Sequence, residues 1–194
     1  MTEFDENHIV VTTIPQPELD DESQSEWITY GKTKGKVLNA PGYPARIPKP
    51  RRPDLYQVKS TPEMGQGLFA HQDIKRGDLI LAERPLLVAP RGIKPLSTGA
   101  IPDHYTPRQI QQIVMYEFES VLETAVARLP PQDQADFKAL HNAHADDGSG
   151  PLLGIARSNG YAIDSLYDSS NKRADYGAIC KIGSRINHRH VSFF

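Results

Sequence analysis

The sequence has very little cysteine and no long apolar run. Cys180 is the only cysteine among 194 residues, so neither a disulfide framework nor a cysteine-rich zinc cluster can form. The longest apolar stretch, residues 79–89, is interrupted by Glu83, Arg84 and Pro85. It falls short of the about 20 residues that a membrane helix needs. We therefore expect an intracellular protein of the nucleus or cytoplasm that makes no contact with a membrane.

Positive charge is missing from the first part of the chain. Residues 1–26 contain eight acidic side chains and no Lys or Arg, and they lack the apolar core of a signal peptide. Residues 27–60 reverse this pattern, with eight Lys or Arg and Asp54 as the single acid. Five prolines between Pro41 and Pro53 favour an extended chain. We therefore expect residues 1–54 to form a disordered, acidic-then-basic, Pro-rich tail.

Four basic residues stand close together in this segment, namely Arg46, Lys49, Arg51 and Arg52. Such a cluster suits either a nuclear-import or nucleic-acid patch or a solvated linker. Basic clusters are common in linkers, so we favour the linker and do not expect direct nucleic-acid binding.

The stretch Met64–Ala89 contains glycines at positions where the backbone needs freedom. Gly65 and Gly67 stand where a strand begins, and the missing Cβ atoms would let backbone approach a ligand. Gly77 suits the left-handed residue of a turn. The apolar patterns around these glycines predict short strands at Leu55–Ser60, Leu68–Ala70, Leu79–Ala82 and Leu86–Ala89.

A long helix is signalled after a loop rich in Gly and Pro. Thr106 is a good N-cap, Pro107 fits the first helical position, and Gln109 completes a capping box. Apolar residues at three- and four-residue spacing continue to Leu129, and we expect this stripe to pack in the core. The remaining patterns predict helices at residues 132–142 and 151–159 and strands at residues 161–163 and 176–182.

One cluster of side chains in the sequence is a candidate for metal binding. His141, His144, Asp146 and Asp147 have the chemistry of metal ligands. The cluster lacks a third ligand at a fixed spacing and leads into a glycine-containing loop. We therefore expect no metal site.

Two separated segments resemble the SET domain family. A glycine-x-glycine strand, a turn of the form A-x-x-D-I-x-x-G-D/E-x-I and an E-R-P-L-L exit within residues 64–89 resemble the opening of that domain. The string GSRINH, which contains Asn187 and His188, resembles the x-S-x-x-N-H-S-C-x-P-N segment of the family. Asn159 in SNGYAI matches a further family position, although its other interpretation is simply a helix cap.

This resemblance implies a fold and an activity. The fold would be α+β, of the SET type, with short strands, small sheets and a helical insertion, and incomplete at its C-terminus. The activity would be methyl transfer from S-adenosylmethionine to a lysine of a protein substrate, histone or non-histone. By resemblance the cofactor would be bound by Gly65, Gln66, Gly67, Leu68, Asn159, Asn187 and His188.

The resemblance also implies domain boundaries and a limit. Residues 55–194 would form a partial SET domain, divided into N-terminal strands (55–89), a helical insertion (90–150), a C-terminal SET segment (151–188) and a divergent end (189–194). Family members continue with Ser-Cys-x-Pro-Asn and carry the catalytic tyrosine beyond that point, so we assign no catalytic residue and expect this chain to be inactive. The alternative is a noncatalytic interaction module or chromatin-associated module.

Overall fold

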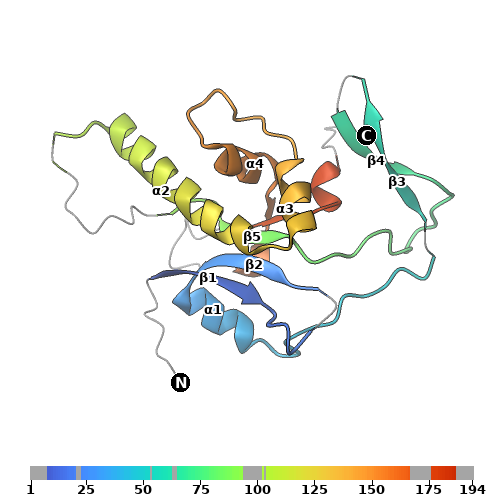
Figure 1. The fold of residues 1–194 in the computed structure, drawn as a ribbon. Helices are drawn as coiled ribbons and strands as arrows, with labels where there is room; N and C mark the ends of the chain where they lie inside the picture. The colour runs from blue at the N-terminus through green and yellow to red at the C-terminus, as the bar shows by residue number, and fades with distance from the viewer. Residues whose placement is uncertain are drawn as a thin grey trace, which may run out of the picture.

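The computed structural model describes residues 8–20, 23–52, 54–62, 65–93, 102, 104–166 and 176–186. These residues form a mixed α+β structure with one five-stranded sheet, one two-stranded sheet and four α-helices (Figure 1). The strands are β1 (Ile9–Ile14), β2 (Ser25–Tyr30), β3 (Tyr56–Thr61), β4 (Gly65–Ala70), β5 (Leu87–Pro90), β6 (Tyr161–Ala162) and β7 (Tyr176–Ile179). The α-helices are α1 (Gly31–Leu38), α2 (Pro107–Arg128), α3 (Pro131–Lys138) and α4 (Pro151–Asn159), and the 3-10 helices are η1 (Asp164–Leu166) and η2 (Gly183–Arg185).

The five-stranded sheet joins segments from both ends of the described chain. Its order is β1-β2-β5-β7-β6. Strands β2 and β5 are parallel, with Trp27 opposite Val88, and the other neighbours are antiparallel. Strand β5 therefore lies at the centre of the sheet, and all four of its residues are buried.

Helices cover both faces of this sheet. Side chains of β5 alternate between two apolar clusters, because successive residues of a strand point to opposite faces. Leu87 packs with Phe118 and Leu122 of α2 on one face, whereas Val88 packs near Val37 of α1 on the other. Figure 1 shows α2, α3 and α4 above the sheet and α1 below it.

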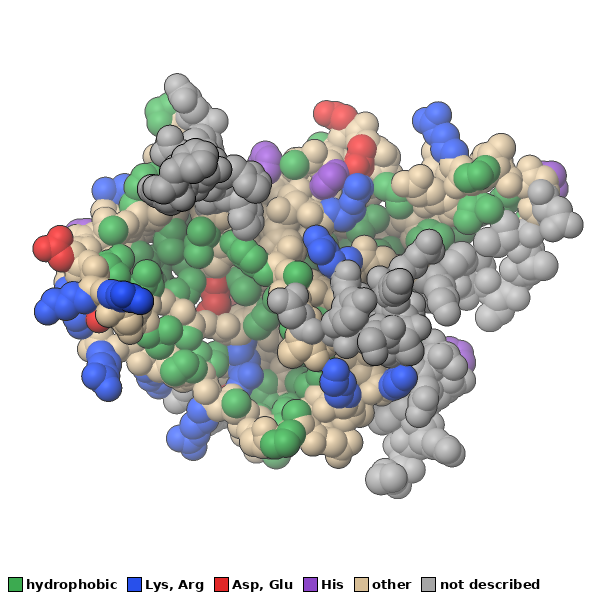
Figure 2. Space-filling view, turned by 180° about the vertical axis from the view of Figure 1, so that it is seen from behind, with side chains coloured by type: hydrophobic (Ala, Val, Ile, Leu, Met, Phe, Trp, Pro, Cys, Tyr) green, Lys and Arg blue, Asp and Glu red, His purple; other side chains and the backbone are tan. Residues whose placement is uncertain are grey.

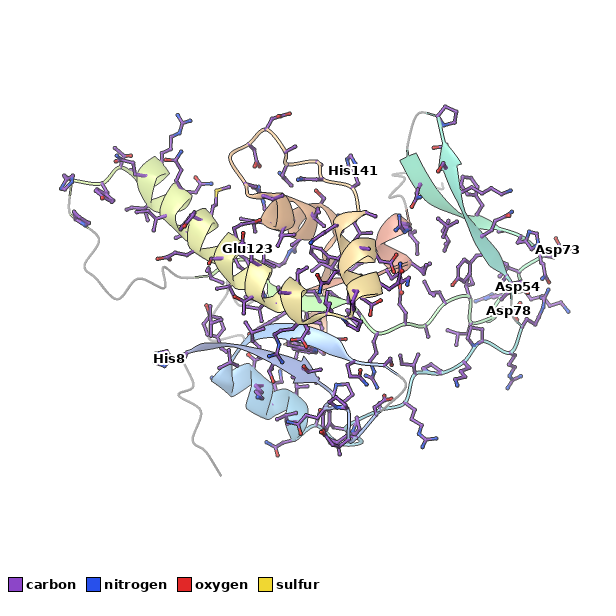
Figure 3. All side chains as sticks on the ribbon, in the orientation of Figure 1. His8, Asp54, Asp73, Asp78, Glu123 and His141 are labelled. Carbon is purple, nitrogen blue, oxygen red and sulfur yellow. The ribbon has the colours of Figure 1, made fainter. Side chains whose placement is uncertain are left out.

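Strands β3 and β4 form a separate antiparallel hairpin. Val58 pairs with Leu68, and Lys59 pairs with Gly67. The hairpin lies at the right of Figure 1, apart from the five-stranded sheet, and Asp54, Asp73 and Asp78 lie at its lower end (Figure 3). Gly77 has a φ of 92°, which confirms the left-handed turn residue predicted from the sequence.

The predicted disordered tail differs from the structure. Much of residues 8–52 is folded, since β1, β2 and α1 all lie there, and β2 is an interior strand of the main sheet. Ile28 of β2 is fully buried. The predicted boundary at residue 54 therefore does not separate a tail from the folded part.

The charged residues of this region made its sequence resemble that of a disordered tail. Glu26 lowers the apparent hydrophobicity of β2, yet only 4% of its surface is exposed. Its carboxylate pairs with Arg128 of α2 at 2.7 Å and accepts a hydrogen bond from Thr13 of β1 at 2.5 Å. A buried carboxylate with such partners is compatible with a core strand. Both partners, Thr13 and Arg128, lie outside β2, so the residues of β2 alone do not reveal them.

The predicted strand at Leu79–Ala82 was wrong. These residues form no strand, and Leu79 and Ile80 are both exposed by more than a third. Strand β4 pairs with β3 throughout its length, and residues 79–82 pair with neither strand. An apolar run becomes a strand only where a neighbouring strand accepts its backbone hydrogen bonds.

Helix α2 was predicted correctly at its start. Thr106 accepts a hydrogen bond from the backbone of Gln109, and the Gln109 side chain accepts one from the backbone of Thr106, which together form the predicted capping box. The helix predicted at residues 132–142 is α3, which ends earlier than expected, at Lys138. The strand predicted at residues 176–182 is β7, which ends at Ile179. Within the described residues, no helix has the length and apolar character needed to cross a membrane.

We predict that Ile28→Ala lowers the free energy of unfolding by about 2–5 kcal/mol, because it removes a fully buried side chain between β1 and β5. Urea unfolding followed by circular dichroism measures this loss. Leu19→Ala is the control, since 55% of Leu19 is exposed and its truncation should change stability little. Equal, small effects of the two substitutions would contradict the placement of β2 in the core.

Candidate cofactor site

The first part of the candidate site is the start of strand β4. Gly65 opens the strand with a φ of 66°, and its carbonyl accepts a hydrogen bond from Thr61 at 3.1 Å. Nothing lies within 4 Å of a Cβ added to Gly65, so space is open beside the backbone there. Gln66 is exposed, Gly67 is buried and Leu68 is partly buried. This local geometry leaves backbone accessible at the beginning of the strand.

The second part is η2, which immediately precedes Asn187 and His188. Those two residues lie outside the described part of the chain. Arg185 of η2 donates a hydrogen bond from its guanidinium to the side-chain oxygen of Gln66 on β4. The two segments that resemble the SET family therefore meet in space, although Gln66 and Arg185 are 119 residues apart in the chain.

Glu83 fixes the start of η2. Its carboxylate accepts hydrogen bonds from the backbone N–H of Ile182 at 3.1 and 3.2 Å and of Gly183 at 2.5 Å. Free N–H groups at a helix start favour a negatively charged acceptor. In the sequence, Glu83 interrupts an apolar run and begins the E-R-P-L-L exit. Neither pattern identifies its backbone partners, which lie about 100 residues later.

Asn159 lies at the end of α4, next to η2. Its side chain is buried, and the amide nitrogen donates hydrogen bonds to the carbonyls of His141 and Ile155, both at 2.7 Å. The backbone carbonyl of Asn159 accepts a hydrogen bond from Ser184 of η2 at 3.0 Å. In this structure the Asn159 side chain thus anchors the helix end, and its backbone supports η2.

Tyr161 and Cys180 complete the surroundings of η2. The Tyr161 hydroxyl donates a hydrogen bond to the carbonyl of Gly183 at 2.8 Å. Burial, together with the negative charge of Glu83, raises the pKa of the Cys180 thiol to about 12. Burial also raises the pKa of Tyr161. Both groups are therefore neutral near pH 7, and a neutral buried thiol is a poor nucleophile.

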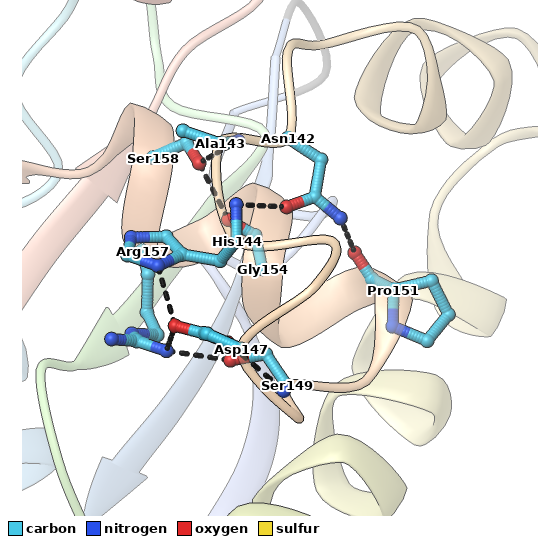
Figure 4. A network of polar contacts seen from close by, with 9 residues as sticks. All are labelled: Asn142, Ala143, His144, Asp147, Ser149, Pro151, Gly154, Arg157 and Ser158. Atoms are coloured by element: carbon cyan, nitrogen blue, oxygen red, sulfur yellow. Dashed lines mark hydrogen bonds and ion pairs between the residues drawn. The ribbon is translucent and has the colours of Figure 1, made fainter.

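Two members of the cluster considered for metal binding, His144 and Asp147, are engaged in hydrogen bonds and ion pairs (Figure 4). His144 contacts Asp147 at 2.7 Å, and Arg157 pairs with the same carboxylate at 2.8 Å. Hydrogen bonds from Ser149, and further ones from His144 and Arg157, hold the pKa of Asp147 well below its usual range. His141 lies on the loop between α3 and α4 (Figure 3). No group of three metal-ligating side chains occurs within the described residues.

Comparison with known proteins gives a similarity to a protein lysine methyltransferase. The relative is the histone-lysine N-methyltransferase set5 of Schizosaccharomyces pombe (strain 972 / ATCC 24843), which is 29% identical to this chain over 139 residues. The matched region is 72% of this chain and 32% of that protein, so the chain spans about a third of the relative's length. No family model and no solved structure matches the chain. This distant similarity supports a SET-like protein.

We predict that Glu83→Ala lowers the free energy of unfolding by about 1–3 kcal/mol, because two backbone N–H groups lose their acceptor. Glu83→Gln keeps one acceptor oxygen and should lose less. Urea unfolding measures both variants, and amide hydrogen exchange should become faster at Ile182 and Gly183.

Glu123→Ala serves as the control for this pair. Glu123 is an exposed residue of α2 (Figure 3), so its truncation should leave stability almost unchanged. The role of Glu83 would be refuted if Glu83→Ala behaved like Glu123→Ala and left exchange in residues 182–183 unchanged.

Proposed function

We propose that this chain carries the cofactor-binding part of a SET-type, S-adenosylmethionine-dependent protein-lysine N-methyltransferase. The observation that carries the proposal is the contact between Gln66 and Arg185, because it brings the GQG strand against the segment that leads into Asn187 and His188. Two family-like segments from distant parts of the chain would then contribute to one binding site. The similarity to a histone-lysine N-methyltransferase supports the same assignment.

The residues at the start of β4 suit a bound cofactor. Gly65 leaves space beside its backbone, and Gly67 brings no side chain to the strand surface. Backbone atoms of residues 65–68 would contact the cofactor, and by resemblance Asn187 and His188, which lie outside the described residues, would contribute further contacts. Asn159 would contribute through its support of η2, since its amide donors are already used. S-adenosylmethionine would supply the methyl group as a sulfonium.

The proposed substrate is a protein with a target lysine, histone or non-histone. The amine must be neutral to accept a methyl group, although the ordinary pKa of lysine is about 10.4. The site would therefore have to favour the neutral amine and hold it in line with the methyl group. Helices α2 and α3 would belong to the helical insertion of the SET-like region, residues 90–150, and border the substrate groove. No residue of this chain is assigned to the catalytic step.

We predict that the full chain binds S-adenosylmethionine and that Gly67→Val weakens binding by about tenfold or more, equivalent to about 1.4 kcal/mol. The added side chain would occupy the space where the backbone meets the cofactor. Isothermal titration calorimetry measures both affinities, and melting temperatures establish that the variant is folded.

Gly35→Val is the matched control for this substitution. Gly35 lies on α1, and nothing stands within 4 Å of a Cβ added there, so cofactor binding should be unchanged. Equal binding by the Gly67→Val variant and the unmodified chain would show that the GQG strand is not part of the site. No binding by any form would instead favour the noncatalytic interaction module. Transfer of a radiolabelled methyl group to histones tests the complete reaction.

A further inference from the structure

A cavity of about 210 Å³ lies between the helices and the main sheet. Residues of α2, α4, β5 and β7 contribute to its lining, so regular secondary structure holds most of its walls in place. Phe118, Leu153 and Ile179 are buried and supply apolar surface. Gly160 and Gly177 present backbone to the same space. The interior of the cavity therefore favours an apolar group.

The polar part of the lining is basic. Arg91, His144 and Arg157 line the cavity, and no acidic side chain of the described residues does. Asp147 neutralises Arg157 through the ion pair drawn in Figure 4. Arg91 is exposed to solvent and forms no ion pair with any residue in the described part of the chain. A guanidinium at the edge of an apolar space favours a ligand with a carboxylate head, which it can bind through two parallel hydrogen bonds.

Two other cavities of the described residues lack this combination. A larger one, of about 610 Å³, is lined by charges of both signs, including Glu26, Arg128 and Lys181. A third, of about 340 Å³, lies beside Arg51 and Arg52 at the hairpin end of the molecule, where Lys and Arg side chains gather (Figure 2). Its walls are loops, and Arg52 already pairs with Asp78.

We propose that the cavity between α2, α4, β5 and β7 binds a small organic carboxylate with a short apolar chain. Pockets for drug-sized ligands begin at about 300 Å³, so this cavity suits a smaller molecule. An apolar cavity of about 150 Å³ is large enough for benzene, so a six-carbon chain can be accommodated. The apolar chain lies against Phe118, Leu153 and Ile179, and the carboxylate faces Arg91. This site is separate from the proposed cofactor site and does not depend on methyl transfer.

The test is a titration of the ¹⁵N-labelled full chain with hexanoate, followed by amide chemical shifts. Hexylamine is the matched probe, since it has the same number of carbon atoms and the opposite charge. Hexanoate should shift the Gly160 and Gly177 amides in a saturable manner, and hexylamine should not. Arg91→Gln should weaken hexanoate binding by about tenfold, as expected for the loss of a charge-assisted contact.

Arg76→Gln is the control variant, because Arg76 is exposed and does not line the cavity. It should bind hexanoate as the unmodified chain does. The proposal is overturned if hexanoate shifts neither glycine, if hexylamine binds as tightly, or if Arg91→Gln and Arg76→Gln have equal effects. Cofactor binding is measured separately by calorimetry, so failure here leaves the methyltransferase proposal unaffected.

Discussion

Four consecutive residues, Glu83 to Leu86, connect most parts of this structure. The Glu83 carboxylate holds the start of η2, and the Arg84 guanidinium binds Asp20 and the carbonyl of Ala45. The carbonyl of Pro85 accepts a hydrogen bond from Ser25 at 2.6 Å, and the N–H of Leu86 donates to Ile179 at 2.8 Å. The N-terminal strands, β7 and η2 are thus all positioned by one extended segment. The geometry of the candidate site depends on it.

Carboxylates provide a recurring means of fixing the elements around the site. Glu83 caps η2, and Glu119 of α2 caps α4 by accepting hydrogen bonds from the N–H groups of Leu152 and Leu153 at 2.9 and 2.7 Å. The N-cap residue Gly150 makes no side-chain cap, and a Cβ there would stand 2.3 Å from the Glu119 side chain. In both cases the acid comes from a distant element. Free backbone N–H groups stabilise both carboxylates, and the dipole of α4 adds to this for the buried Glu119.

Local signals explain which parts of the fold could be predicted from the sequence. Residues close together in the chain predict the capping box at Thr106, the turn at Gly77 and strands β3 and β4. The region before residue 54 could not be predicted, because β2 pairs with β5 about 60 residues later and its charge is neutralised by Arg128. Composition alone does not reveal such long-range partners.

The candidate site could be predicted from the sequence only in part. The resemblance assigned the GQG strand and the GSRINH segment to one pocket, and the structure brings Gln66 and Arg185 into contact. It did not identify Glu83, Ser184 or Tyr161, whose roles depend on hydrogen bonds to backbone groups of η2 or of residues next to it. The Asn159 side chain donates hydrogen bonds to the backbone carbonyls of His141 and Ile155. Glu83 and Ser184 lie within family-like strings, but the strings do not show which backbone groups their side chains bind.

We propose that the β3–β4 hairpin and η2 form one site for S-adenosylmethionine. Hydrogen exchange of the full chain, measured by mass spectrometry with and without S-adenosylmethionine, is the sharpest test of this site. Exchange should become slower in residues 65–70 and in residues 180–186 at the same cofactor concentration. Protection of only one of these segments, or of neither, would contradict it.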